Sequence, residues 1–207
     1  MKTPIVTIID YGIGNLWSVA SAIKYLGAKV EFTSDCNKIS TSKVLILPGV
    51  GSFRNGMEIL RSSAIDKAIK YAVKDNNSRI LGICLGMQLM GSYSTEDGGS
   101  EGLGLIPNKV DRFNQGESNY KIPHVGFNVV NFSERHGLFK DFSDASDFYF
   151  THSYRMLVDQ ISGRYATCNY GDEFLAAFQI DNIYGVQFHP EKSQTNGLLL
   201  LRNFLND

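Results

Sequence analysis

Short apolar runs alternate with amphipathic stretches along the chain up to residue 90. Residues 44–47 are continuously apolar, 5–9 is apolar except for Thr7, 29–33 alternates, and 79–83 forms a further apolar run, so each of these segments reads as a strand. Between them, apolar side chains recur at helical spacing over residues 16–26, 57–73 and 85–90. This alternation predicts a mostly parallel sheet that is covered by helices on both faces, with right-handed crossovers.

Beyond about residue 102 the pattern changes to short strands separated by polar turns. The predicted strands are 110–113, 127–131, 148–150, 165–170, 175–180 and 183–188, and an amphipathic helix over 197–205 follows them. This half is expected to be an antiparallel extension of the same domain. Because no repeat, low-complexity tract or linker divides the sequence, residues 1–207 are predicted to form a single domain.

Composition and charge exclude several classes of function. The 20 basic and 21 acidic side chains nearly balance, so nothing favours nucleic acid as a partner. No apolar stretch is long enough to span a membrane, and the start of the sequence lacks the pattern of a secretory signal, so a cytoplasmic location is expected. The three cysteines lack the paired spacing of a disulfide framework or a zinc site, which leaves free thiols for chemistry.

The strongest candidate for chemistry is Cys84 in the segment Gly82-Ile83-Cys84-Leu85-Gly86. The form G-x-C-x-G is typical of a nucleophile elbow, in which a strained turn between a strand and a helix exposes the nucleophile. The glycines would give clearance, and the amides that begin the helix at Leu85 would favour the thiolate. On its own, the motif equally fits a buried cysteine between two loop glycines. Cys36 and Cys168 have neither flanking glycines nor a base nearby in sequence and are predicted to be non-catalytic.

A second pair of candidates lies near the end of the chain. His189 ends an apolar strand and Glu191 follows two positions later. A base that takes a thiol proton needs a partner that fixes its tautomer and stabilises the imidazolium, and this pair can supply both roles. Pro190 between them stiffens the spacing. A histidine at a strand end is usually structural, but together with the cysteine elbow it indicates a Cys–His–Glu triad.

The sequence resembles the class I, triad-type glutamine amidotransferases, and among them the glutaminase subunits of imidazole glycerol phosphate synthase. The resemblance extends over essentially the whole chain. It rests on residues 10–16 (DYGIGNL), 47–53 (LPGVGSF), 82–89 (GICLGMQL), 101–106 (EGLGLI), 121–128 (KIPHVGFN), 149–154 (YFTHSY) and 185–193 (GVQFHPEKS). It implies a three-layer, flavodoxin-like α/β fold with an antiparallel extension.

This resemblance also implies roles for individual residues. Cys84 would attack the side-chain amide of glutamine, giving a γ-glutamyl thioester and ammonia, while His189 moves the proton and Glu191 orients it. The backbone amides of Leu85 and Val50 would form the oxyanion hole, and the Val50 peptide would flip between two orientations, which flanking glycines make easy. The expected glutamine-binding residues are Gly49, Gly51, Gln88, Glu96, Ser153 and Tyr154. No metal and no cofactor is implied.

A partner subunit is a further implication of the resemblance. Ammonia released into water is lost, and the glutaminase fills this chain, so the acceptor site is expected on a second polypeptide. In the resembled enzyme the partner is a (β/α)8-barrel cyclase that forms a heterodimer with the glutaminase. Asn15, His124 and Phe127 are predicted to line the face toward it.

One departure and three alternatives remain open. Phe127 stands where the family usually has tryptophan, which could indicate a paralogue that supplies ammonia to a sugar-modifying partner in surface polysaccharide synthesis. A cysteine hydrolase or peptidase with the same elbow is a second alternative, although it would not need Gln88 or the turn at 48–51. A non-catalytic binding module of this fold is the third, although such a module would be expected to have a broken triad.

Overall fold

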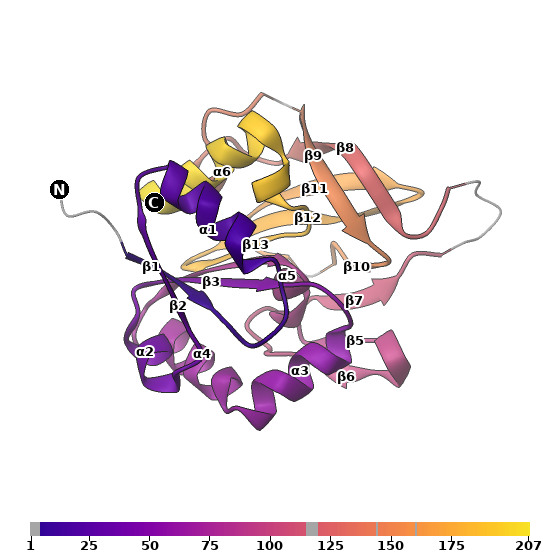
Figure 1. Ribbon diagram of the computed structural model, residues 1–207. Coiled ribbons are helices and arrows are strands. Elements are labelled where there is room, and N and C mark those ends of the chain that lie inside the picture. The colour runs from indigo at the N-terminus through magenta and orange to yellow at the C-terminus, as the bar shows by residue number, and fades with distance from the viewer. Residues whose placement is uncertain (1–4, 115–119, 144, 160) are drawn as a thin grey trace.

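The computed structural model describes residues 5–114, 120–143, 145–159 and 161–207 and is built around a nine-stranded sheet (Figure 1). The first five strands in spatial order are parallel, as the sequence predicts. They are β2 (Lys29–Thr33), β1 (Ile5–Ile9), β3 (Val44–Gly49), β4 (Arg79–Cys84) and β13 (Ile183–Val186). The strand order β2-β1-β3-β4-β13 is that of doubly wound flavodoxin-like folds.

An antiparallel extension continues the same sheet, which confirms the second half of the prediction. Its strands are β12 (Asp172–Ile180), β11 (Arg164–Tyr170), β8 (His124–Phe132) and β9 (Ala145–His152). A smaller sheet lies beside it and contains β10 (Tyr154–Met156), β7 (Lys109–Arg112), β5 (Tyr93–Ser94) and β6 (Ser100–Glu101). The chain passes from β9 directly into β10, so the two sheets meet at Ser153.

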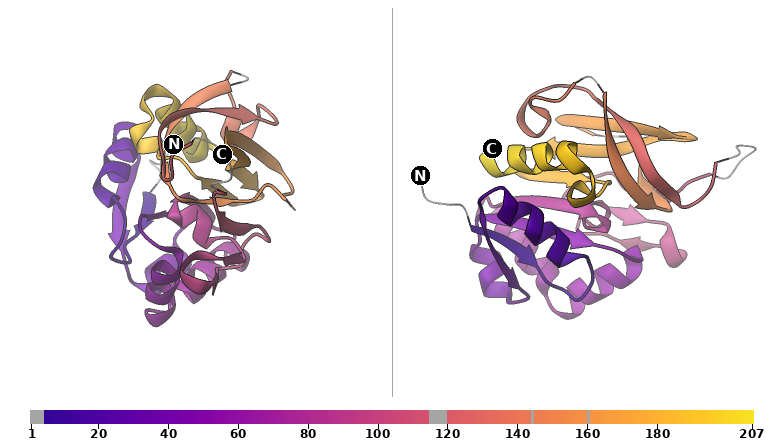
Figure 2. Two further views of the ribbon diagram at one scale, coloured as in Figure 1. Left: turned by 90° about the vertical axis from the view of Figure 1, so that its right-hand side faces the viewer. Right: turned by 45° about the horizontal axis from the view of Figure 1, so that its top comes forward.

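Helices cover both faces of the parallel half. On one face α1 (Leu16–Tyr25) and α6 (Gln194–Asn206) lie side by side, and on the other lie α2 (Cys36–Thr41), α3 (Phe53–Ser62), α4 (Ile65–Lys74) and α5 (Leu85–Leu89) (Figure 2). Strand β3 separates the two cores: Ile46 packs with the first helix pair, whereas Leu45 and Leu47 pack with the second group. Both faces of this strand are therefore buried, which explains its unbroken apolar sequence.

Two helical predictions need correction. The segment 57–73, expected as one helix, is divided into α3 and α4 at Ala64, which has a left-handed backbone (φ 58°). The hydroxyl of Ser63 donates to the carbonyl oxygen of Ile59 at 2.7 Å, a local bond that competes with continuation of the helix. Helix α2 was not expected, although Asp35 caps it by accepting bonds from the amides of Asn37 and Lys38.

Three short 3₁₀ turns complete the described chain: η1 (Glu96–Gly98), η2 (Gly137–Phe139) and η3 (Pro190–Lys192). Among the described residues, no helix is long and apolar enough to cross a membrane. Within the same part of the chain, no three His, Cys, Asp or Glu side chains converge as metal ligands.

Candidate active site

Cys84 occupies a sharp turn between β4 and α5. Its backbone is strained, with φ 54° and ψ −112°, a conformation rare for a residue with a side chain. A Cβ atom on Gly82 would lie 2.7 Å from the backbone of Met87, and one on Gly86 would lie 1.7 Å from the carbonyl oxygen of Leu47. Only glycine fits at either position, so the elbow geometry predicted from the sequence is confirmed.

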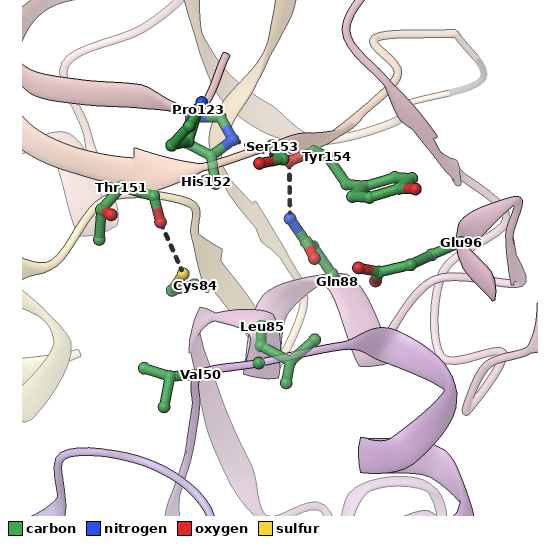
Figure 3. Close-up of a pocket in the computed structure, with 11 residues that line it drawn as sticks. Val50, Cys84, Leu85, Gln88, Glu96, Pro123, Thr151, His152, Ser153 and Tyr154 are labelled. Carbon is green, nitrogen blue, oxygen red and sulfur yellow. Dashed lines mark hydrogen bonds between the residues drawn. The ribbon is translucent and has the colours of Figure 1, made fainter.

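The Cys84 sulfur is almost completely enclosed. Its Sγ lies 4.0 Å from the carbonyl oxygen of Thr151, and the side-chain amide of Gln187 donates to it at 3.7 Å. The first contact comes from β9 in the antiparallel half (Figure 3). The second comes from the segment that connects β13 to His189. The two halves of the sheet therefore meet at this sulfur.

His189 and Glu191 form a buried pair beside the elbow. The Nδ1–H of His189 donates to Oε1 of Glu191 at 2.9 Å, and the two side chains are only 3% and 1% exposed. Backbone bonds hold the histidine: its amide donates to the Tyr149 carbonyl, and its carbonyl accepts from the Ser193 hydroxyl. The His189 Nε2 atom is buried and has no hydrogen-bond partner among the residues that the structure describes. An unpartnered buried nitrogen of this kind is free to exchange a proton with a thiol or a substrate.

The charges around His189 favour its imidazolium form. Burial lowers its pKa, but the adjacent Cys84 sulfur and the Glu191 carboxylate outweigh burial and raise the pKa from 6.5 to about 9. At neutral pH a cation therefore lies beside the sulfur. This arrangement stabilises a thiolate, the reactive form of cysteine.

A pocket of about 410 Å³ opens above the sulfur (Figure 3). The structure brings eight of the predicted site residues to its wall: Val50, Gly51, Cys84, Leu85, Gln88, Glu96, Ser153 and Tyr154. Gly49 lies beneath the wall, where a Cβ atom would meet the Tyr11 hydroxyl at 2.5 Å. Pro123, Thr151 and His152 also line the pocket, and the sequence motifs did not single them out for binding.

Gln88 and Glu96 present acceptors to the same end of the pocket. The Gln88 Nε2 donates to the carbonyl oxygen of Tyr154 at 2.9 Å and to Oε1 of Gln187 at 2.7 Å, so both its hydrogens are used and Oε1 remains. Glu96 Oε2 accepts the amide of Phe53 at 2.7 Å. Burial, more than the charge of Asp97, raises the pKa of Glu96, while the Phe53 bond opposes the rise. Two acceptors that line the same pocket suit an ammonium group.

Tyr11 supports the turn that follows β3 and was missed in the sequence. Its hydroxyl donates to the Pro48 carbonyl at 2.8 Å. Burial, together with the nearby Cys84, raises the pKa of Tyr11, so the hydroxyl remains a donor. In the turn itself, Val50 is exposed and Gly51 has φ 103°. The motif that contains Tyr11 was recognised, but nothing in it indicated that this side chain reaches the turn.

The predicted partner-facing residues divide into two groups. Phe127 is 48% exposed on β8, and Asn15 is an accessible cap of α1. The expectation for His124 is wrong, because its side chain is only 2% exposed. It stacks on Tyr170, and its Nδ1 lies 3.0 Å from Nε2 of His152, so it belongs to the interior. Side chains alternate between the two faces of β8. The odd-numbered residues from Val125 onward face outward, so His124 faces inward.

The other two thiols lie away from the pocket. Cys168 is fully buried in β11, and burial raises its pKa to about 12, which makes it unreactive. Cys36 begins α2 and donates to the Ser63 carbonyl at 3.4 Å.

Together, the doubly wound sheet, the cysteine elbow and the buried histidine–glutamate pair have the geometry expected of an α/β enzyme with a cysteine nucleophile. The sequence model of the family described as glutamine amidotransferase class-I matches residues 7–207, so the chain belongs to this family. It is therefore a glutamine amidotransferase.

Relatives and solved structures agree with this family. The chain is 45% identical over 203 residues to imidazole glycerol phosphate synthase subunit HisH 1 of Parasynechococcus marenigrum, covering 97% of each chain. It is 43% identical to subunit HisH of Moorella thermoacetica, covering 96% of this chain and 93% of the relative. Among solved structures, a glutamine amidotransferase aligns with TM-score 0.74 and PurLQS from Thermotoga maritima with 0.72, each at 18% identity and 97% or more coverage of both chains. These two structures support the fold.

Proposed function

We propose that this chain is the glutaminase subunit of an imidazole glycerol phosphate synthase. It hydrolyses L-glutamine to glutamate and ammonia and passes the ammonia to a separate (β/α)8-barrel cyclase. The observation that carries the chemistry is the enclosed Cys84 sulfur beside the His189–Glu191 pair, at the base of a pocket with acceptors at its far end. The names of the full-length relatives support the assignment to this synthase.

The reaction follows from the arrangement of charges. The Cys84 thiolate attacks the side-chain carbonyl carbon of glutamine, and the oxygen becomes an oxyanion that the amides of Leu85 and Val50 would receive. The His189 imidazolium then gives its Nε2 proton to the departing nitrogen, which leaves as ammonia. Water attacks the resulting γ-glutamyl thioester, His189 accepts a proton from it, and glutamate is released with Cys84 restored. Glu191 holds the imidazole through Nδ1 in both steps.

The amino-acid end of glutamine is proposed to bind to the pocket wall formed by Gln88, Glu96, Ser153 and Tyr154. We propose that Gln88 Oε1 and the Glu96 carboxylate receive the α-ammonium group, with Ser153 and Tyr154 closing the pocket above it. The pocket volume of about 410 Å³ admits a free amino acid. A peptide would need an open groove instead, which favours an amidotransferase over a peptidase.

The partner is proposed to dock on the exposed face of β8. Val125, Phe127 and Val129 alternate outward along this strand and are among the most exposed large apolar side chains of the described chain. The same strand contacts β9, which provides Thr151 at the sulfur. Docking can therefore reach the active site through two adjacent strands.

The test combines the full chain with candidate partners. The purified chain should hydrolyse glutamine slowly, and addition of the histidine-pathway cyclase with its acceptor nucleotide should increase the rate greatly. A chain that turns over glutamine equally fast with and without that partner contradicts the coupling. Stimulation by a sugar-modifying partner alone would assign the chain to the polysaccharide paralogue.

A further inference from the structure

Gln187 is a fully buried glutamine that contacts the nucleophilic sulfur, and the proposed reaction has not yet used it. It follows β13 directly and precedes His189 by two positions. Its Nε2 donates to Cys84 Sγ at 3.7 Å, and its Oε1 accepts from Gln88 Nε2 at 2.7 Å. One side chain therefore connects the sulfur to a residue of the pocket wall.

A backbone carbonyl fixes the direction of this connection. The carbonyl oxygen of Tyr154 can only accept, so the atom of Gln88 that faces it must be nitrogen. The same nitrogen faces Gln187, and the Gln187 atom opposite it must therefore be oxygen. This leaves the Gln187 nitrogen toward Cys84. A reversed Gln187 amide would set two donors against each other and an oxygen against the sulfur.

The Tyr154 carbonyl is itself held in place. His152 Nδ1 lies 2.7 Å from it and donates the proton, since a carbonyl can only accept. His152 Nε2 is then an acceptor and receives the Nδ1 proton of His124 at 3.0 Å. Burial lowers the pKa of His152 to about 3 and that of His124 to about 4, so both rings are neutral at pH 7. The directions of the two hydrogen bonds from His124 to His152 and from His152 to the Tyr154 carbonyl are therefore fixed at physiological pH.

We propose that Gln187 is a positioning residue that stabilises the Cys84 thiolate through its side-chain N–H. The donor adds to the effect of the His189 imidazolium, which also interacts with this sulfur. A hydrogen bond to an anion is stronger than one to a neutral thiol, so the contact favours ionisation as well as position. This inference rests on Cys84 being the nucleophile of the proposed function.

The experiment measures alkylation of Cys84 by iodoacetamide in the full-length chain, with the modified residue identified by mass spectrometry. Gln187→Met keeps a side chain of similar volume and removes the N–H donor. We expect its alkylation rate to fall about tenfold at pH 6.5 and the deficit to narrow at pH 9.5, because a donor that favours loss of the thiol proton matters most where protons are abundant. Gln187→Glu, which puts an acceptor against the sulfur, should be slower still at pH 6.5.

Gln179→Met is the matched control. Gln179 is also buried, and its amide accepts from the Leu138 N–H and donates to Asp207, away from the pocket. Its loss should leave the alkylation profile unchanged at both pH values. If a Gln187 variant does not fold, Gln88→Met replaces it. That variant frees the Gln187 amide from its acceptor role and should give a smaller deficit of the same pH dependence.

Two results would overturn the inference. One is an unchanged rate at both pH values, and the other is a deficit of equal size at both, which would indicate only a displaced sulfur. Wild-type alkylation separates this inference from the proposed function. If the wild-type chain is alkylated at Cys84 and glutamine protects it, the nucleophile stands whatever the Gln187 variants do. If Cys84 is not the protected residue, the proposed function fails first.

Discussion

The parallel and antiparallel halves of the large sheet contribute to the site in different ways. In the parallel half, β3 and β4 are buried on both faces, and Cys84 stands at the carboxyl end of β4, where ligands bind in such folds. In the antiparallel half, β8 leaves Val125, Phe127 and Val129 exposed, while β9 places Thr151 over the sulfur. The proposed nucleophile thus lies at the carboxyl end of tightly packed central strands, and the strands that cover it have an exposed outer face.

This difference predicts different sensitivities to mutation. Substitutions at the carboxyl ends of β3 and β4 should reduce activity or stability in the isolated chain. Substitutions on the outer face of the antiparallel half should leave the isolated chain nearly intact and act only when the partner is present.

The largest effect is expected from Glu191→Gln. Loss of the carboxylate removes the charge that stabilises the His189 imidazolium, and it replaces a group that can only accept by an amide that can also donate, so the tautomer is no longer fixed. Turnover of glutamine should fall roughly 10³-fold. Because the protonated form of His189 is lost as pH rises through its pKa of about 9, wild-type kcat/KM should decline on that side. In the variant this decline should move to lower pH. Glu173→Gln, at the exposed second position of the otherwise largely buried strand β12, is the control and should change neither quantity.

Gly86→Ala should produce the next largest effect. The new Cβ atom would lie 1.7 Å from the Leu47 carbonyl oxygen, so β3 and α5 must separate. We expect a loss of about 3 kcal/mol in the free energy of unfolding, measured by urea denaturation. Gly126→Ala on β8 meets no atom within 4 Å and incurs only the strain of its positive φ, roughly 1 kcal/mol. Equal losses in the two variants would contradict the contrast between the halves.

The buried histidine pair should make stability depend on pH. The folded-state pKa of His152, about 3, lies below its unfolded value of 6.5. The unfolded chain therefore binds more protons, and stability falls as pH decreases from about 6.5 toward that folded-state value. Between pH 7 and pH 5 this residue should account for about 2 kcal/mol. In His152→Gln the unfolding free energy should decrease by about that much less over the same interval. Identical pH profiles would show that the ring is not held neutral.

The smallest effect on the isolated chain is expected from Phe127→Ala. The ring is half-exposed and packs against the ring of Tyr149, with centroids 5.7 Å apart. The unfolding free energy should change by less than about 0.5 kcal/mol, as for surface positions. The dissociation constant for the cyclase partner should rise about tenfold, since exposed aromatic side chains anchor interfaces. A loss of basal glutaminase activity equal to the loss in the complex would contradict a docking role.

Much of the parallel half could be predicted from sequence because each element has a local signal. Residues 44–47 are apolar without interruption because both faces of the strand are buried, and the glycines around Cys84 are fixed by steric clearance. The break between α3 and α4 was missed because it depends on the left-handed backbone of Ala64. Alanine favours helices and rarely adopts that conformation, so the sequence gives no sign of the break.

The rest of the site depends on distant contacts that leave no local pattern. Gln187 reaches Cys84 across 103 positions, and Gln88 reaches Tyr154 across 66. Tyr11 lies in a recognised motif, yet its bond to Pro48 joins separate strands. His124 was predicted to face the partner because its whole motif was interpreted as surface. Alternation along 124–132, counted from the exposed Phe127, would have placed its side chain in the interior.

The central claim is that Cys84 is the nucleophile of a glutaminase, and covalent labelling tests it most directly. A glutamine-mimicking diazoketone should modify Cys84 alone in the full-length chain, glutamine should protect it, and Cys84→Ala should lose both labelling and turnover. Labelling that glutamine does not slow, or glutaminase activity retained by Cys84→Ala, would contradict the account.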